Sequence, residues 1–436
     1  MREKIISWGV ADRQLTNGER WLTLICLLVF ATVSMYNQVK PTPVMMQIGA
    51  AFNMGLDSVG NLMTFFSITG LVVSLPGVWI MRNLGIKTSL LIGGLITLIG
   101  GLLGVTAQSA EMMLFSRVLE GMGLTVITVL GPNVIPRLFP ESKYGLVMGV
   151  WSMWPAGGMI FTSLAGPAIY EASGWQGIWW VSIALSLVAL LLCLVFCKFN
   201  KVSEKVLENK AESKGNIARP SFIASGVILA VFFMTYCGLY GCVTTFYPTF
   251  LQEVKGMSVA MASMPVLVIA ILTIPLSIVI GMITDKFNIR KWWLVVTYLV
   301  LSLSGSFLAY NMSPEEVTPW VTAVFIAIAA GGIPVTTRAL IPILIADQRK
   351  MDYVLGIMSA TTYIGFMFAT PFGALAASTG WTNAALIFYG CFGLVTTVIM
   401  AIFVKNDHAL MKQQQKELAA HGENLKQLEQ EVLSDE

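Results

Sequence analysis

The chain has 436 residues, of which 56% are hydrophobic and only 12% are charged. This composition excludes an ordinary soluble globular protein and predicts a membrane protein. The formal charge of +3 gives no reason to expect a nucleic-acid partner, because most Lys and Arg residues lie between apolar segments, where they set membrane topology.

Apolar segments of about 20 residues, the length of one membrane crossing, follow one another along the chain. Their ranges are 21–48, 61–81, 88–110, 112–136, 144–170, 172–197, 220–252, 256–284, 292–314, 317–346 and two within 353–404. The sequence therefore predicts an all-α membrane protein with 12 transmembrane helices in two six-helix bundles. We expect the first bundle at 1–197, a cytoplasmic linker at 198–219, the second bundle at 220–404 and a cytoplasmic tail at 405–436.

Positive charge orients these helices. With the N-terminus inside, 23 of the 27 Lys and Arg residues fall in segments on the cytoplasmic side. Since positive charge stays cytoplasmic, we expect a multi-pass protein of the cell (inner) membrane with both termini inside and no removed signal peptide. The six Cys residues lie in apolar runs without metal-ligand spacing, so neither a metal nor a cofactor is expected.

The chain repeats itself after about 206 residues. Pro136 at the end of the fourth helix corresponds to Pro342 at the end of the tenth, and Gly174 before the sixth helix corresponds to Gly380 before the twelfth. Self-similarity at a fixed offset indicates one structural unit used twice.

The clearest repeated motif lies after the second and eighth helices. Residues 281–291 have the form G-x-x-x-D-[RK]-x-x-x-R-[RK], and residues 77–87 are their counterpart, with Met81 in place of the acid. This loop resembles the hallmark of the major facilitator superfamily of secondary transporters, and the resemblance covers nearly the whole chain. It implies a gating latch on the cytoplasmic side, formed here by Gly77, Arg82, Gly281, Asp285, Lys286 and Arg290.

A second element resembling this family opens the fourth helix, where residues 117–123 fit the pattern R-x-x-x-G-x-G. Arg117 and Glu120 are one turn apart, so they can pair and lower each other's cost in the membrane. The pairing favours the ionised carboxylate. We expect a coupling role for these two residues; the alternative is a purely structural pair.

The solute is predicted from charge. Lys40, Arg117 and Arg338 lie at membrane depth against Glu120 alone, and an excess of fixed positive charge attracts anions. Residues 37–41 resemble a first-helix signature of the cyanate-porter and organic-anion porter group, and Pro41 breaks the helix and frees the Asn37 carbonyl. The superfamily resemblance implies that helices 1, 4, 7 and 10 line the cavity. The expected substrate-binding residues are Tyr36, Asn37, Lys40, Tyr236, Tyr240 and Arg338.

The sequence leaves several alternatives open. We expect a monomeric transporter, not an enzyme, that moves a small anionic, organic-acid-like solute by alternating access, with proton coupling or exchange. Proton-coupled efflux of amphipathic drugs or metabolites is the second interpretation, and a transporter-like ligand sensor is the third. Lys40 and Arg338 also fit side chains that merely extend to the membrane interface.

Overall fold

The computed structural model describes residues 10–11, 15–139, 143–200, 223–310, 317–344 and 348–404. Most of the predicted linker and the tail lie outside these ranges. Two short strands, β1 (Val10–Ala11) and β2 (Phe199–Asn200), pair in parallel, and the rest of the described secondary structure is helical.

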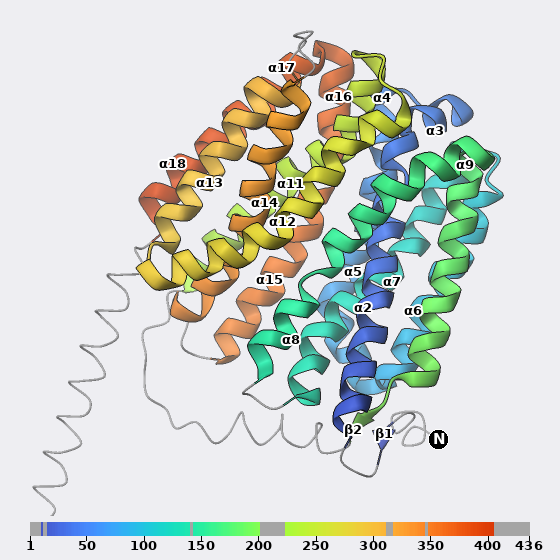
Figure 1. The fold of residues 1–436 in the computed structure, drawn as a ribbon, viewed down its shortest axis with the longest axis vertical. Coiled ribbons are helices and arrows are strands. Elements are labelled where there is room, and N and C mark those ends of the chain that lie inside the picture. The colour runs from blue at the N-terminus through green and yellow to red at the C-terminus, as the bar shows by residue number, and fades with distance from the viewer. Residues whose placement is uncertain are drawn as a thin grey trace, which may run out of the picture.

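The N-terminal half contains the helices up to Phe196 (Figure 1). They are α2 (Asn17–Val39), η1 (Thr42–Val44), α3 (Met45–Phe52), α4 (Leu56–Val59), α5 (Asn61–Leu84), α6 (Ile86–Val105), α7 (Ala110–Leu138), α8 (Tyr144–Trp151) and α9 (Trp154–Phe196).

The C-terminal half is also built from interrupted helices. Its helices are α11 (Ile223–Glu253), α12 (Val259–Phe287), α13 (Arg290–Ser304), η3 (Gly305–Ala309), α14 (Thr318–Leu344), α15 (Gln348–Phe366), α16 (Ala369–Thr379), α17 (Trp381–Ala385), η4 (Leu386–Gly393) and α18 (Leu394–Phe403). The segments η3 and η4 are π-helical.

Eleven helical stretches in the described residues are long and apolar enough to cross a membrane. One of them, Leu146–Phe196, has 51 residues and is interrupted at Ser173 and Gly174, which leave the helical region. Since a crossing needs about 20 residues, this stretch divides into two crossings. The predicted all-helical membrane fold is confirmed, and the crossings agree with the predicted twelve.

The backbone itself carries the repeat. The described residues with positive φ form three pairs: Asn53 with Gly256 and Gly85 with Asn288 are each 203 residues apart, and Gly174 with Gly380 are 206 apart. Helix α7 ends at Leu138 and α14 at Leu344, again 206 residues apart. The two halves therefore break their helices at corresponding places, because Gly and Asn tolerate the left-handed region best.

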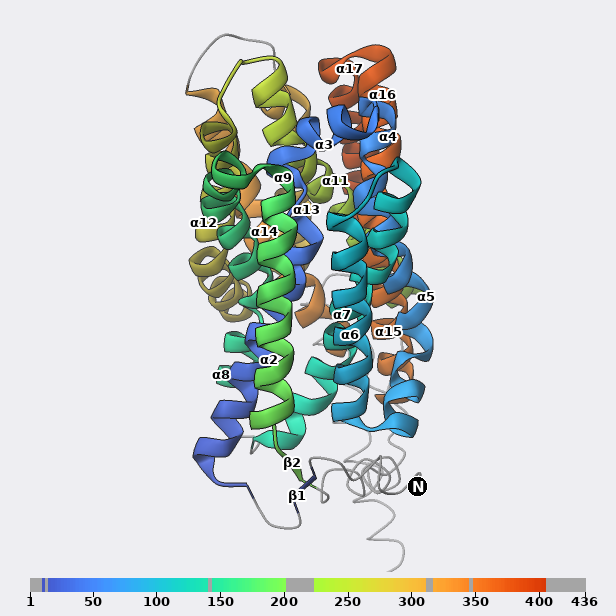
Figure 2. The same cartoon turned by 90° about the vertical axis from the view of Figure 1, so that its right-hand side faces the viewer.

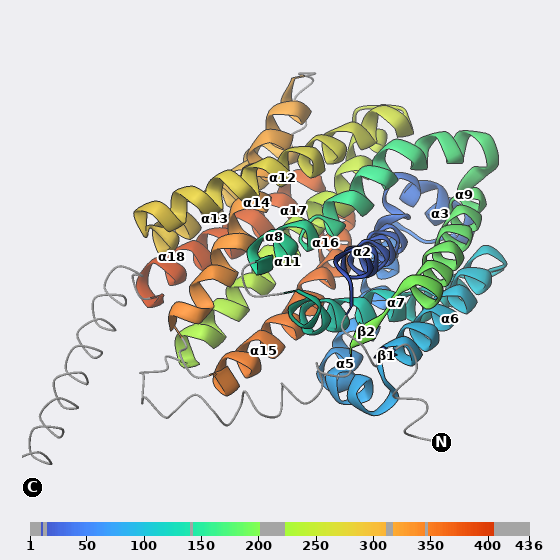
Figure 3. The same cartoon turned by 60° about the horizontal axis from the view of Figure 1, so that its bottom comes forward.

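The halves stand side by side, as the view from the lower end shows (Figure 3), with α2, α6, α7 and α9 in one and α11 to α14 with α18 in the other. Figure 2 shows α4 next to α16 at the upper end. Within the first half, α6 turns large side chains such as Ile99 and Leu102 outward and packs glycines against α7. Small residues at such contacts let membrane helices approach closely.

Gly100 of α6 gives a direct test of this packing. A Cβ added there would lie 2.7 Å from the backbone nitrogen of Glu120, so we expect Gly100→Ala to destabilise the protein by about 1–3 kcal/mol through overpacking. The measurement is thermal unfolding in detergent, followed by tryptophan fluorescence. Gly149→Ala is the matched control, since nothing lies within 4 Å of its added Cβ. Equal unfolding temperatures for the two variants would contradict the close approach of α6 and α7.

Candidate functional site

Three charged side chains meet inside the N-terminal half, and we call Lys40, Arg117 and Glu120 the charge cluster. The Nζ of Lys40 lies 2.6 Å from Oε1 of Glu120, and Arg117 pairs with Oε2 of the same carboxylate. Their side chains are 0%, 0% and 1% exposed. The predicted pairing of Arg117 with Glu120 is confirmed, and Lys40 joins it from another helix.

The break after α2 builds the acceptors for Arg117. Pro41 has no N–H, so the carbonyl of Asn37 loses its normal helical donor. In the structure this carbonyl accepts a hydrogen bond from Arg117 at 2.8 Å, and the Gln38 carbonyl accepts another at 2.8 Å. The Nε of Arg117 donates to the Leu62 carbonyl at 3.1 Å. The freed carbonyl that the sequence predicted thus serves the guanidinium of Arg117.

Lys40 does not present its ammonium to an open cavity wall, as the sequence had suggested. It is fully buried, donates to Ser182 Oγ at 2.8 Å as well as to Glu120, and lies 4.4 Å from the ring centroid of Trp179. Burial is tolerated because the carboxylate, a hydroxyl and an aromatic face replace water. All of these partners belong to the N-terminal half.

The other two predicted residues of the first helix, Tyr36 and Asn37, are also buried and bonded within the N-terminal half. Tyr36 is buried, donates its hydroxyl to the Ile178 carbonyl at 3.1 Å and packs edge-on against Phe161. The amide of Asn37 donates to Ser186 Oγ at 2.8 Å. Both therefore fasten α2 to α9 in this structure.

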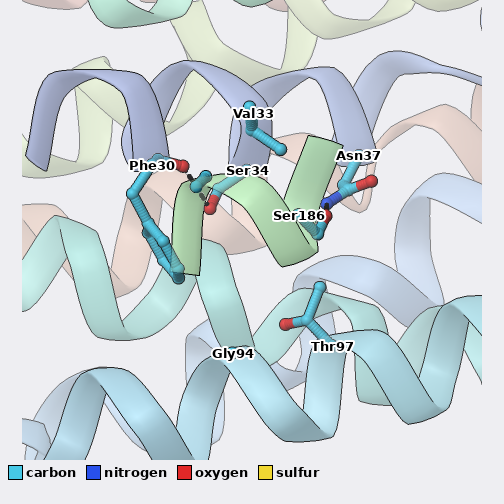
Figure 4. Close-up of a pocket in the computed structure, with 8 residues that line it drawn as sticks. Phe30, Val33, Ser34, Asn37, Gly94, Thr97 and Ser186 are labelled. Carbon is cyan, nitrogen blue, oxygen red and sulfur yellow. Dashed lines mark hydrogen bonds between the residues drawn. The ribbon is translucent and has the colours of Figure 1, made fainter. Parts of the chain in front are cut away.

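A small cavity adjoins this contact (Figure 4). The volume open to the centre of a water molecule is about 10 Å³. The cavity is lined by Phe30, Val33, Ser34, Asn37, Gly94, Thr97, Ser186 and Ala189. Four of these residues carry hydrogen-bonding side chains, which is the setting in which proteins hold single buried waters.

Arg338 of α14 has a different environment from the charge cluster. Its side chain is exposed, although it lies within the candidate span Thr318–Ile341. Its guanidinium carbon is 5.9 Å from the ring centroid of Phe233. Among the described residues, no carboxylate or hydrogen-bond acceptor pairs with it. An intramembrane cation that lacks such a partner is a candidate for binding a ligand.

Aromatic rings of α11 extend from Arg338 toward the other half. The ring centroids of Phe233 and Tyr236 are 5.5 Å apart. The rings of Tyr236 and Tyr240 are stacked, with centroids 5.6 Å apart and an interplanar angle of 15°. The hydroxyl of Tyr240 reaches Met159 Sδ of α9 at 3.4 Å. We call Phe233, Tyr236 and Tyr240 the ring row; it leads from a cation on α14 to the N-terminal half.

The predicted gating residues are only partly described. Three of them, Gly77, Arg82 and Asp285, are described only as parts of helices. Their surroundings lie outside the described part of the structure. Arg290 is buried and donates to Asn288 Oδ1 at 3.2 Å. Lys286 is exposed beside Phe287, and Gly281 faces Val335 of α14. The gating role stays a prediction.

Hydrogen bonds join the two halves near α4 and α16. Gln252 donates to the Pro43 carbonyl at 2.9 Å and accepts from Gln47 at 3.0 Å. The Thr64 and Thr370 hydroxyls lie 2.7 Å apart, and Thr370 also donates to Asn61 at 2.8 Å. We call these five side chains and the Pro43 carbonyl the clasp. It holds the halves together at the end opposite Arg338, which lies six residues before the end of α14.

Gln252 tests the clasp, because it bonds to two groups of the other half. We expect Gln252→Ala to raise labelling of a cysteine placed at Thr42, a buried residue beside Pro43, several-fold in an otherwise cysteine-free protein. The neighbouring exposed residue gives the control Glu253→Ala, which should leave labelling unchanged. Equal labelling in the two variants would mean that Gln252 does not hold this end closed.

Sequence reasoning missed the residues of α9 that complete the buried site. Ser182 and Ser186 are one turn apart in the stretch 177–196 of α9, which is otherwise apolar, and Trp179 is one turn earlier on the same face. A polar pair at that spacing was the available signal. Phe233 was missed as well, because a Phe in an apolar span is normally expected to pack against neighbouring helices.

Comparisons with known proteins agree with this architecture. Residues 22–351 match the model of the Major Facilitator Superfamily. The probable sugar efflux transporter of Haemophilus influenzae (strain 86-028NP) is 23% identical over 96% of this chain and 98% of its own. The galactose-proton symporter of Escherichia coli K12 is 27% identical over 27% of this chain. The first three curated relatives are matched over at most 25% of their own length.

Solved structures show the same fold. The crystal structure of a D-xylose-proton symporter superimposes with a TM-score of 0.72 at 14% identity, covering 89% of this chain and 98% of the other. A bacterial homologue of the human lysosomal transporter Spinster, in an inward-facing and unoccupied conformation, gives a TM-score of 0.63 at 16% identity over 92% of this chain and 99% of its own. With the family match over most of its length, this chain belongs to the major facilitator superfamily.

Proposed function

We propose that this chain is a secondary transporter whose solute is an organic anion with an apolar, planar body, moved across the cell membrane by alternating access. The solute site lies between α11 and α14, at Arg338 and the ring row. The charge cluster acts in coupling. The end that carries α4 and α16 faces outward, because 23 of the 27 Lys and Arg residues then lie on the cytoplasmic side.

The single observation that carries this proposal is the environment of Arg338. It is an exposed cation within a span, and in the described part of the chain it has no acidic or hydrogen-bonding partner. Charge-assisted hydrogen bonds to a carboxylate are the interactions a guanidinium makes best. The ring row lies beside Arg338. Phe233 and Tyr236 are buried and Tyr240 is partly buried, so the rings meet the apolar part of the solute when this contact opens during transport.

Lys40 no longer supports the anionic solute, because its ammonium is buried inside the N-terminal half and already bonded to Glu120 and Ser182. Of the two predicted solute-binding cations, Lys40 and Arg338, the proposal therefore keeps Arg338 on the tenth helix. Tyr236 and Tyr240 keep their predicted role as solute contacts, while Tyr36, Asn37 and Lys40 take supporting positions within the N-terminal half.

A neutral sugar is the second candidate, since the names of several relatives refer to sugars. A screen of thermal stability in detergent separates the candidates, with benzoate, succinate, galactose, xylose and the dication methyl viologen as probes. We expect benzoate to raise the unfolding temperature of the wild type but not of Arg338→Gln, with Arg20→Gln as a control far from the site. Stabilisation by galactose or xylose alone would favour the sugar, and stabilisation by methyl viologen alone would favour drug efflux.

A further inference from the structure

The charge cluster carries one more positive than negative charge when every group is ionised. Lys40 and Arg117 share one carboxylate, that of Glu120. The groups packed around them are uncharged: Tyr36 from the same helix, Ser182 and Trp179 from α9, and Phe66 from α5. No second carboxylate of the described chain contacts either cation. A net charge buried this deeply costs several kcal/mol, and loss of one proton removes it.

We propose that Lys40 is the group that binds and releases the transported proton, with Glu120 as its fixed counter-ion and Arg117 as a permanent cation. This rests on the proposed function, since it assigns the coupling site of that transporter. It differs from the sequence-based expectation, which assigned coupling to Arg117 and Glu120.

Arg117 is unsuited to this role. A guanidinium keeps its proton in proteins, whereas a lysine ammonium titrates readily when it is buried. Arg117 also donates to three backbone carbonyls, those of Asn37, Gln38 and Leu62. These bonds hold α2 and α5 to α7 and require the planar guanidinium.

Lys40 can lose a proton without disturbing its surroundings. Its Nζ donates to Glu120 Oε1 and Ser182 Oγ, and a neutral amine still has two N–H groups for these acceptors. The third N–H gives its proton to a water molecule, which becomes hydronium, and the nitrogen of Lys40 keeps the electron pair. Protonation therefore changes the charge of the cluster and leaves its hydrogen bonds in place.

A place for a water molecule lies one helical turn from Lys40. Asn37 precedes Lys40 by one turn of α2, Ser186 follows Ser182 by one turn of α9, and both line the cavity shown in Figure 4. Its 10 Å³ for a water centre is about what one molecule requires. The cavity thus offers a water position near Lys40, on the side toward the start of α2.

Lys40 lies close along the chain to a contact between the two halves. Pro41 and η1 follow Lys40 directly, and the Pro43 carbonyl accepts the hydrogen bond from Gln252 of the other half. A change of charge at the end of α2 therefore acts on the segment that the clasp holds.

The test is a pH titration of tryptophan fluorescence in purified full-length protein, because Trp179 lies against the Lys40 ammonium. We expect a transition in the wild type that is lost in Lys40→Met, in Lys40→Arg and in Trp179→Phe. Lys87→Met is the matched control: Lys87 is also a buried lysine of this half, bonded to the Leu194 carbonyl, and its replacement should keep the transition. A transition that persists in Lys40→Met or Lys40→Arg would overturn the proposal.

A second readout uses proteoliposomes and benzoate. Lys40→Arg should retain benzoate counterflow, which needs no net proton movement, and lose accumulation driven by a pH gradient. Accumulation at the wild-type level in Lys40→Arg would overturn the assignment. The fluorescence titration needs no solute, so a wild type that ignores benzoate but shows the Lys40-dependent transition would refute the proposed anion and support the proton site.

Discussion

Replacing Glu120 with Gln is expected to destabilise the protein by about 3–5 kcal/mol, the usual cost of removing one partner from a buried ion pair. Lys40 and Arg117, both 0% exposed, would then face each other without a carboxylate. The measurement is chemical unfolding in detergent, followed by the fluorescence of the buried Trp179 and its neighbours.

The double variant Lys40→Met/Glu120→Gln is the control for this prediction. It removes one positive charge together with the negative one, so it should recover part of the lost stability. If Glu120→Gln alone unfolds at the wild-type denaturant concentration, the charge cluster does not hold the N-terminal half together.

Arg338→Gln is expected to lower the affinity for an organic anion by about 10- to 100-fold, because a hydrogen bond to a charged group contributes about 1.5–3 kcal/mol. Protein stability should hardly change, since the Arg338 side chain is exposed and has no acidic partner in the described chain. Titration of benzoate binding in detergent, with unfolding temperatures as a parallel readout, measures both effects.

A charge-conserving substitution at the same position gives an intermediate case. Arg338→Lys keeps the charge but loses the planar fork that binds a carboxylate through two bonds, so its affinity should lie between those of the wild type and Arg338→Gln. An affinity for benzoate that is the same in all three proteins would place the anion elsewhere.

Local patterns in the sequence predicted the features that depend on neighbouring residues. The pairing of Arg117 with Glu120 follows from their spacing of one helical turn. The left-handed breaks at Gly174 and Gly380 follow from the repeat and from glycine. The freed carbonyl at Asn37 follows from Pro41, whatever the tertiary structure.

The partner of Lys40 could not be predicted in this way. Glu120 is 80 residues away, and only the packing of α2 on α7 and α9 brings the two together. Charge counting treated Lys40 as an available cation, although its ammonium is already bonded to Glu120 and Ser182 in the folded protein. The π-helical segments η3 and η4 were not predicted either; they contact each other through Tyr389 and Gly305, and a contact between residues so far apart is not visible in the local sequence.

The most direct test of the proposed anion site is uptake into proteoliposomes that contain the wild type or Arg338→Gln, reconstituted in equal amounts. Radiolabelled benzoate and galactose are offered separately under an inward pH gradient. The proposal predicts saturable benzoate uptake by the wild type, at least tenfold slower uptake by Arg338→Gln at low benzoate concentration, and no galactose uptake by either protein. Galactose uptake that is equal in the two proteins, with no uptake of benzoate, would contradict it.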